Sequence, residues 1–135
     1  MGTILRSASA FGIDCVVLSS DCADIYNPKT IRGAMGALFR TKIVFAEDIV
    51  AAISCLRERG HCVYAAALDP KAVRLGRDTL SRGDCVMIGN EGHGLSAAAI
   101  QAAEKSLYIP MEEGSESLNA AIAASVLLWS LYVGR

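Results

Sequence analysis

The chain has 135 residues, of which 53% are apolar, and its 13 basic and 14 acidic side chains leave a formal net charge of −1. This length fits one domain, which we assign to residues 1–135, and the near-neutral charge gives no global sign of a nucleic-acid-binding protein. The apolar content is high for a monomer, so it favours an oligomer with a buried interface.

The five cysteines form no C-x-x-C pair. An odd count without paired spacing predicts reduced thiols in a cytoplasmic protein, and it argues against a disulfide framework or a zinc site. We expect no signal peptide, because no basic region followed by an apolar one opens the sequence. The apolar run 118–133 is slightly short for a membrane span, so we predict a buried helix and no membrane partner.

Hydrophobic periodicity predicts alternating helices and strands along the chain. The first helix places Ile4, Leu5, Ala8 and Phe11 on one face and ends at Gly12. A second begins at Pro28, because proline is favoured in the first helical turn. The further predicted helices span residues 46–59, 96–105 and 120–133. The predicted strands span residues 13–18, 42–45, 61–68, 84–88 and 107–109, and residues 69–82 are predicted to be mostly loop.

Alternation of short apolar strands with helices implies an α/β sandwich with a mostly parallel sheet. The second helix is expected to carry Ile31, Met35 and Leu38 on its apolar face. The last helix has almost no polar face, and a helix that is apolar all round must be buried on every side. We therefore expect it to lie between the core and a partner subunit.

Two loops follow predicted strands and contain groups suited to ligand binding. The first, Gly89-Asn90-Glu91-Gly92-His93-Gly94, leads into a helix, so its backbone amides can approach a ligand closely. Its spacing is not the dinucleotide fingerprint, and taken alone a tight turn is the plainer interpretation. The second loop covers residues 110–117, and ligands bind open α/β sheets at such strand ends.

Three separate blocks of the sequence together match one family. They are Gly2–Gly12, Ile88–Ser96, and Ile109-Pro110-Met111 followed by Glu116–Ala121. These blocks and their order resemble the catalytic domain of the SpoU (TrmH-type) RNA ribose 2′-O-methyltransferases. The segments Asn27–Lys29 and Met35–Arg40 are also similar to that family, so the resemblance covers nearly the whole chain.

The resemblance implies a trefoil-knotted α/β fold, which is a rare exception to the rule that chains avoid knots. It implies a homodimer formed through the C-terminal helix and S-adenosylmethionine bound in the knot, with no metal. The substrate would be a ribose 2′-hydroxyl of tRNA or rRNA, to which the cofactor's methyl group is transferred.

The family pattern assigns catalytic roles to Arg6, Glu91, Ser117 and Asn119. Since arginine is almost always protonated, we expect Arg6 to orient the hydroxyl and stabilise charge. With Thr3 as the N-cap, Arg6 takes the third helical position, where a cation opposes the helix dipole. Either Ser117 or Asn119 also suits the N-cap of the last helix.

By the same resemblance, a group of residues in the two loops and at their ends would hold the cofactor: Gly89, Asn90, Gly92, Gly94, Ile109, Met111 and Leu118. The second loop also carries an acidic lip, Glu112, Glu113 and Glu116, for which the pattern offers no role beside an RNA phosphate.

The sequence departs from the family at its start, because an asparagine two positions before Gly2 and the strand before it are absent. We therefore expect a sheet that lacks its first strand and no separate RNA-binding domain. Five basic residues remain candidates for a local RNA patch: Arg6, Lys29, Arg32, Arg40 and Lys42. Two alternatives stay open, a Rossmann-type nucleotide binder and a truncated, non-catalytic dimerisation module that binds S-adenosylmethionine or RNA.

Overall fold

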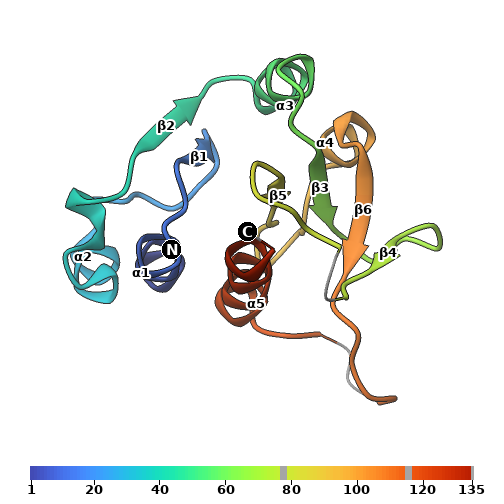
Figure 1. Ribbon diagram of the computed structural model, residues 1–135. Coiled ribbons are helices and arrows are strands. Elements are labelled where there is room, and N and C mark those ends of the chain that lie inside the picture. The colour runs from blue at the N-terminus through green and yellow to red at the C-terminus, as the bar shows by residue number, and fades with distance from the viewer. Residues whose placement is uncertain (77–78, 115–116, 135) are drawn as a thin grey trace.

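A computed structural model of the chain describes residues 1–76, 79–114 and 117–134. Helices and strands alternate through most of these residues (Figure 1). In chain order the elements are α1 (Gly2–Ala10), β1 (Val16–Ser19), α2 (Pro28–Ala34), the 3-10 helix η1 (Ala37–Phe39), β2 (Ile43–Ala46), α3 (Ile49–Glu58), β3 (Val63–Ala66), β4 (Val73–Arg74), β5 (Cys85–Met87), α4 (Ala97–Ala102), β6 (Lys105–Tyr108) and α5 (Ala120–Val133).

The strands form two sheets, and every strand pair in them is parallel. One sheet has the order β1-β2 and the other β4-β6-β3-β5. The predicted parallel pairing is confirmed, but the single sheet expected from the sequence is divided in the described chain, with β1 and β5 each at an edge. The two sheets nevertheless share a core, because Val16 of β1 and Val86 of β5 pack against the same cluster.

The larger sheet lies between helices on both faces, so the predicted sandwich is present. Successive residues of a strand point to opposite faces. On β3, Val63 accordingly packs with Ile53 of α3 and Ala99 of α4, whereas Tyr64 packs with Leu127 of α5. In Figure 1, α3 and α4 lie together at the top, and α5 lies between this sheet and α1.

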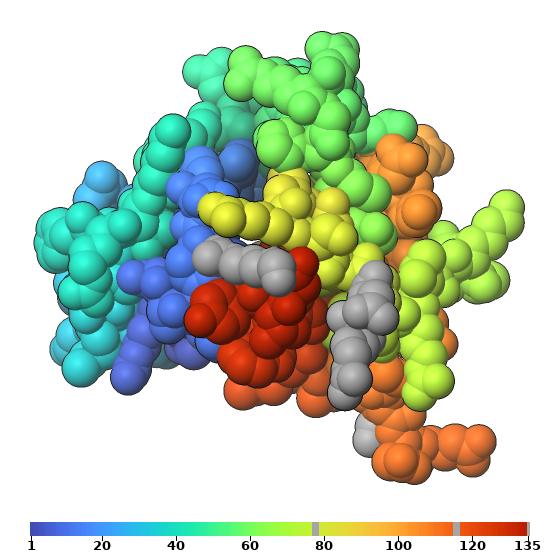
Figure 2. Space-filling model, in the orientation of Figure 1, coloured from blue at the N-terminus to red at the C-terminus, as the bar shows by residue number. Residues whose placement is uncertain are grey.

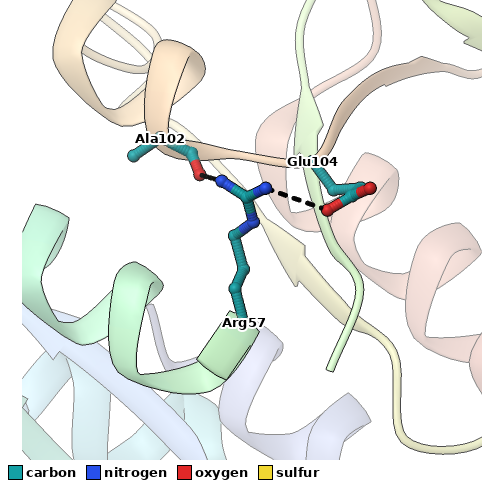
Figure 3. Close-up of polar contacts among 3 residues, drawn as sticks. All are labelled: Arg57, Ala102 and Glu104. Carbon is teal, nitrogen blue, oxygen red and sulfur yellow. Dashed lines mark hydrogen bonds and ion pairs between the residues drawn. The ribbon is translucent and has the colours of Figure 1, made fainter. Parts of the chain in front are cut away.

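An exposed arginine ties the outer helix layer to the sheet. Arg57 of α3 donates to the carbonyl oxygen of Ala102 at 3.0 Å and pairs with the carboxylate of Glu104 at 3.1 Å (Figure 3). The predicted helix 96–105 ends early at this point, because the Glu104 amide bonds to the carbonyl of Val63 instead. Pairing with β3 thus converts Lys105 from the predicted helix into the first residue of β6.

Side-chain caps explain where several helices begin. The Asn27 side chain accepts from the Lys29 amide at 2.9 Å, with Pro28 in the first turn of α2. The Asp48 carboxylate accepts two amides at the start of α3, and the Ser96 hydroxyl accepts the Ala99 amide in α4. Such caps satisfy amides that have no partner within the helix.

The expected apolar face of α2 is wrong. The helix ends at Ala34, and Met35 turns into the left-handed region with φ 49°, so Ile31 and Met35 point to solvent with 38% and 66% of their surface exposed. The buried residues are instead small ones, Thr30 and Ala34. The reason is the close approach of α1, since a Cβ on Gly2 would lie 2.4 Å from the Thr30 carbonyl oxygen.

Helix α1 begins at Gly2 rather than after Thr3, so Arg6 lies in its second turn and opposes the helix dipole less than predicted. Its buried residues recur every third position. Leu5 packs in a cluster with Leu18 of β1, and Ala8 packs in the separate cluster that contains Leu127 of α5. Helix α1 therefore lies in both cores.

The bounds of α5 agree with the prediction, but in the single chain only one side of the helix is buried. Ala124, Leu127, Leu128 and Leu131 face the core. Ile122, Trp129, Tyr132 and Val133 are 43–52% exposed on the other side. Figure 2 shows the red residues of α5 uncovered in the middle of the visible face. None of the described helices has the length and apolar character needed to cross a membrane.

Candidate functional site

Parallel strands place their carboxyl ends at one edge of a sheet, and the loops after β5 and β6 begin there. The second of these loops leads to α5. Here the structure brings two predicted site residues together, because Asn119 Nδ2 donates to Glu91 Oε1 at 3.0 Å. The two residues are 28 positions apart in the chain, and both are exposed.

Asn119 uses both ends of its side-chain amide. Its Oδ1 accepts the amides of Ala121 at 3.0 Å and Ile122 at 3.4 Å, so it is the N-cap of α5. The nitrogen end is then free to hold the Glu91 carboxylate. Ser117, the other candidate cap, is exposed and makes no hydrogen bond within the described residues.

The glycine-rich loop is closed by its own hydrogen bonds. Asn90 and Gly94 exchange backbone bonds of 3.2 and 2.8 Å, and the Gly92 amide donates to Asn90 Oδ1 at 2.7 Å. These amides are therefore already used. In the described chain the amides of Gly89, Glu91 and His93 donate to no protein acceptor, so they are the loop donors left for a ligand.

The glycines of this loop are required by its shape. A Cβ on Gly89 would lie 2.3 Å from the Gly94 carbonyl carbon and 2.5 Å from the Leu95 nitrogen, and Gly94 itself has φ +69°. Only glycine avoids both the clash and the strain. The tight-turn interpretation therefore accounts for Gly89 and Gly94 without a ligand.

The loop after β1 carries a carboxylate whose pKa is shifted, which the sequence did not indicate. The pKa of Asp21 is lowered, first by a hydrogen bond from the Ser19 hydroxyl, then by its own backbone amide, and to a smaller extent by the charge of His93. His93 lies in the loop after β5, so the pKa of Asp21 responds slightly to a charge on a different loop.

Arg6 is exposed on α1, and its guanidinium makes no hydrogen bond or ion pair with the part of the chain that the structure describes.

A pair of hydroxyls joins α1 to α5. Ser125 Oγ donates to the Ala121 carbonyl at 2.8 Å, so its proton is already used, and Ser7 Oγ must donate to Ser125 Oγ, also at 2.8 Å. The sequence analysis did not predict the Ser7–Ser125 hydrogen bond. The signal was the presence of Ser125 in α5, a helix with few polar residues.

The other predicted cofactor-binding residues, in the described part of the second loop and at its ends, make no side-chain hydrogen bond to Glu91 or Asn119. The Ile109 side chain packs against the core, whereas Met111 and Leu118 are 38% and 39% exposed. In Figure 1 the segment after β6 extends away from the body of the protein before the chain returns to α5. Glu112 and Glu113 of the acidic lip are exposed in that segment, and Glu116 lies outside the described residues.

A separate hollow of about 510 Å³ lies between the start of α1, the β1–α2 loop and α2. It is lined by Met1, Gly2, Thr3, Ala23, Asp24, Asn27, Lys29, Thr30 and Gly33. Its lining includes Gly2 and Thr3 of the helix that carries Arg6, but neither Glu91 nor Asn119. Among the described residues no three His, Cys, Asp or Glu side chains are placed to hold a metal ion.

Comparison with known proteins gives a family match. The model of the "SpoU rRNA Methylase family" matches residues 1–129. The chain is 36% identical over 131 residues to the 23S rRNA (guanosine(2553)-2'-O)-methyltransferase RlmP of Bacillus subtilis, covering 97% of this chain and 52% of that protein. The chain therefore spans about half the length of this curated relative.

Solved structures agree with this match. The SpoU methyltransferase AviRb from Streptomyces viridochromogenes, solved in complex with AdoMet, superposes with a TM-score of 0.83 at 27% identity, over 98% of this chain and 53% of that chain. An AdoMet-bound rRNA methyltransferase from Sinorhizobium meliloti superposes with a TM-score of 0.78 at 29% identity, over 96% and 49%. These matches favour the methyltransferase interpretation over a Rossmann-type nucleotide binder.

The hydrogen bond between Asn119 and Glu91 can be tested by moving the amide donor from residue 119 to residue 91. Asn119→Asp keeps a good cap for α5 but sets two carboxylates against each other, so we expect a loss of about 1 kcal/mol in the free energy of unfolding. Adding Glu91→Gln supplies a new donor and should restore most of that loss. Urea unfolding of the two single variants and the double variant measures the coupling, and strictly additive effects would contradict it.

The hydroxyl pair between α1 and α5 has a matched control on the same helix. Ser125→Ala removes the acceptor of Ser7, and we expect a loss of about 1–2 kcal/mol in stability. Ser130 also bonds to the carbonyl four residues earlier, at 3.1 Å, but makes no bond to α1. Ser130→Ala should therefore change the free energy of unfolding by less than Ser125→Ala, and equal losses in urea unfolding would argue against the bond between the helices.

Proposed function

The chain belongs to the SpoU rRNA methylase family, and on that basis we propose that it transfers a methyl group from S-adenosylmethionine to a ribose 2′-hydroxyl of tRNA or rRNA. The family match over residues 1–129 carries this proposal. Because the chain spans about half the length of its listed relatives, the activity of the whole protein is part of the proposal.

The residues at the strand ends suit an adenosyl group. The amides of Glu91 and His93 have no acceptor in the described chain, and both are exposed beside the Glu91–Asn119 bond. Met111 and Leu118 offer exposed apolar surface on the following loop, and an apolar side chain can cover an aromatic base. We assign these four residues to cofactor binding. Gly89, Asn90, Gly92 and Gly94 would shape the glycine-rich loop, and Ile109 would anchor the start of the second loop to the core.

The bound cofactor supplies a methyl group on a positively charged sulfur, and the ribose oxygen displaces that sulfur in line. The protein must align the oxygen and stabilise the charge that develops as its proton leaves. We assign this to Arg6, whose guanidinium is exposed and unpaired in the described chain and whose fork suits an RNA phosphate beside the hydroxyl. The hydrogen bond between Glu91 and Asn119 holds the glycine-rich loop against the start of α5. Ser117, two residues before Asn119, is a further polar group there.

We also infer the trefoil knot and the homodimer. The structural likeness to SpoU methyltransferases supports a last helix threaded through a loop. The exposed side of α5 supports a partner there, because Ile122, Trp129 and Val133 form one apolar stripe and no charged residue lies between Asn119 and Gly134. Trp129 also packs edge-to-face with Phe11 at a centroid distance of 5.7 Å and at a tilt with Tyr132 at 5.8 Å, and such rigid aromatic groups are frequent at interfaces.

The five cysteines are all free, and the pKa of the Cys85 thiol is raised by burial and then by the charge of Asp84. Unpaired thiols support the proposed cytoplasmic location. Mapping 2′-O-methyl groups by mass in RNA from cells with and without the gene would identify the modified RNA and nucleotide.

Replacement of Arg6 tests the catalytic proposal. Arg6→Ala should lower the rate of methyl transfer to RNA about 100-fold or more, because a charge aimed at the reacting oxygen is lost. The affinity for S-adenosylmethionine, measured by calorimetry, should stay unchanged. Arg6→Lys keeps the charge but not the fork, so we expect an intermediate rate.

The control for this experiment is Arg59→Ala, an exposed arginine at the end of α3. Unchanged turnover in Arg6→Ala would remove Arg6 from the mechanism. If the wild-type chain binds S-adenosylmethionine but methylates no RNA, the non-catalytic alternative is favoured.

Replacement of Ile122 tests the dimer. Ile122 is 52% exposed at the third position of α5, where Glu favours the helix, so Ile122→Glu should leave the helix intact. A two-fold interface would set the two new carboxylates in an apolar contact, and we expect sedimentation to show dissociation. Leu68→Glu changes an 80% exposed apolar residue elsewhere and should have no effect. A dimer that survives Ile122→Glu would contradict the proposed interface.

A further inference from the structure

A second exposed surface differs from α5 in its charge. Residues 25–46, which we call the cationic segment, contain Lys29, Arg32, Arg40 and Lys42 and no acidic residue. The flanking acids are Asp24 and Glu47. Since the whole chain has a net charge of −1, the rest of the sequence is net acidic. The cations are thus concentrated in one stretch, covering α2, η1 and β2.

The cationic segment also exposes large apolar side chains. Phe39 is 85% exposed, more than any other large hydrophobic residue in the described ranges, and Met35 and Tyr26 are each 66% exposed. Phe45 on β2 is 62% exposed. Large exposed apolar side chains that share one segment with cations are typical of a surface that binds a partner.

On α2 the cations and the apolar side chains share the outward face. A helix turns about 100° per residue, so Arg32 lies opposite the buried residues Thr30 and Ala34. Ile31 and Lys29 flank it on either side. The chain then continues through η1 to Phe39 and Arg40, both exposed. In Figure 1, α2 and β2 form the left side of the molecule, on the far side of α1 from α5.

The charge pattern decides which partner fits. In a two-fold interface the cationic segment would meet itself, and its four cations would face four more with no acid between them. The uncharged stripe on α5 has no such conflict. An RNA strand offers the complementary charge in its phosphates, and its bases have flat faces that stack on exposed aromatic rings.

We propose that the cationic segment is the surface on which the substrate RNA strand binds, with Arg32 and Arg40 contacting phosphates and Phe39 stacking on a base. This proposal rests on the proposed function. Helix α1 packs against α2 and η1, so the surface is attached directly to the helix that carries Arg6. The described part of the second loop, which carries Glu112 and Glu113, lies on the side of the molecule away from α2 in Figure 1, where it would not oppose the phosphates.

The phosphate contacts are tested by the salt dependence of RNA binding. Fluorescence anisotropy with a labelled single-stranded RNA gives the dissociation constant at each salt concentration. An RNA of about 16 nucleotides is long enough to fill a typical single-strand binding site. Each lost phosphate contact lowers the slope of log affinity against log salt by about 0.7, so Arg32→Gln with Arg40→Gln should lower it by about 1.4. Arg59→Gln with Arg74→Gln removes the same charge from exposed sites elsewhere and should leave the slope nearly unchanged.

The stacking contact is tested by Phe39→Ala, for which we expect RNA affinity to fall about tenfold at constant salt. Leu68→Ala removes a comparably exposed apolar side chain and should have no effect. Neither position is buried, so both variants should fold, which thermal unfolding would verify. Equal RNA affinity in Phe39→Ala, the double arginine variant and their controls would overturn the proposal. Loss of self-association in Phe39→Ala with RNA affinity kept would also overturn it, in favour of a protein interface.

Methyl transfer is measured separately, so that the two proposals can fail independently. A wild-type chain that methylates RNA while the surface variants match their controls would overturn only the RNA surface. A wild-type chain without methyl transfer, whose RNA affinity still falls in the surface variants, would overturn the proposed enzyme and leave the RNA surface supported.

Discussion

The position of α1 between two cores is the constraint on which the rest of this structure depends. The two sheets share no backbone hydrogen bond in the described chain, so side chains must hold them together. Helix α1 places Leu5 in one cluster and Ala8 in the other, while Gly2 allows α2 to approach until only small residues fit. Any movement of α1 would therefore disturb both cores, and this fixes the direction in which Arg6 leaves the helix.

Polar bonds then connect the start of α5 to elements far from it in the chain. Asn119 caps the helix with its oxygen and holds Glu91 with its nitrogen, and Ser125, six residues further along α5, accepts the hydroxyl of Ser7. The donors are the Asn119 side-chain nitrogen and the Ser7 hydroxyl, which make no hydrogen bond to the backbone of their own helix among the residues that the structure describes. The glycine-rich loop, the helix with Arg6 and the last helix are thus held together by a few side chains, while the loop's glycines satisfy its own geometry.

Two apolar surfaces remain exposed, and their charges distinguish them. The outward side of α5 carries no charged residue, which suits contact with an identical surface. The cationic segment combines Phe39 with four basic residues and no acid, which suits a polyanion with flat bases. The proposed methyltransferase, acting on RNA as a dimer, would need both kinds of surface, and α1 packs against both α5 and α2.

The sequence by itself determined the elements with strong local signals: the bounds of α5, the starts of α2 and α4 at their caps, the parallel strand–helix alternation and the family. It also predicted that Glu91 and Asn119 belong to one site. Only the tertiary structure decided which face of α2 is buried, because the close approach of Gly2 excludes large side chains there. It likewise converted residues 105–106 from a predicted helix or turn to strand and exposed one side of α5. These outcomes depend on contacts between residues distant in the chain, which periodicity and capping patterns do not encode.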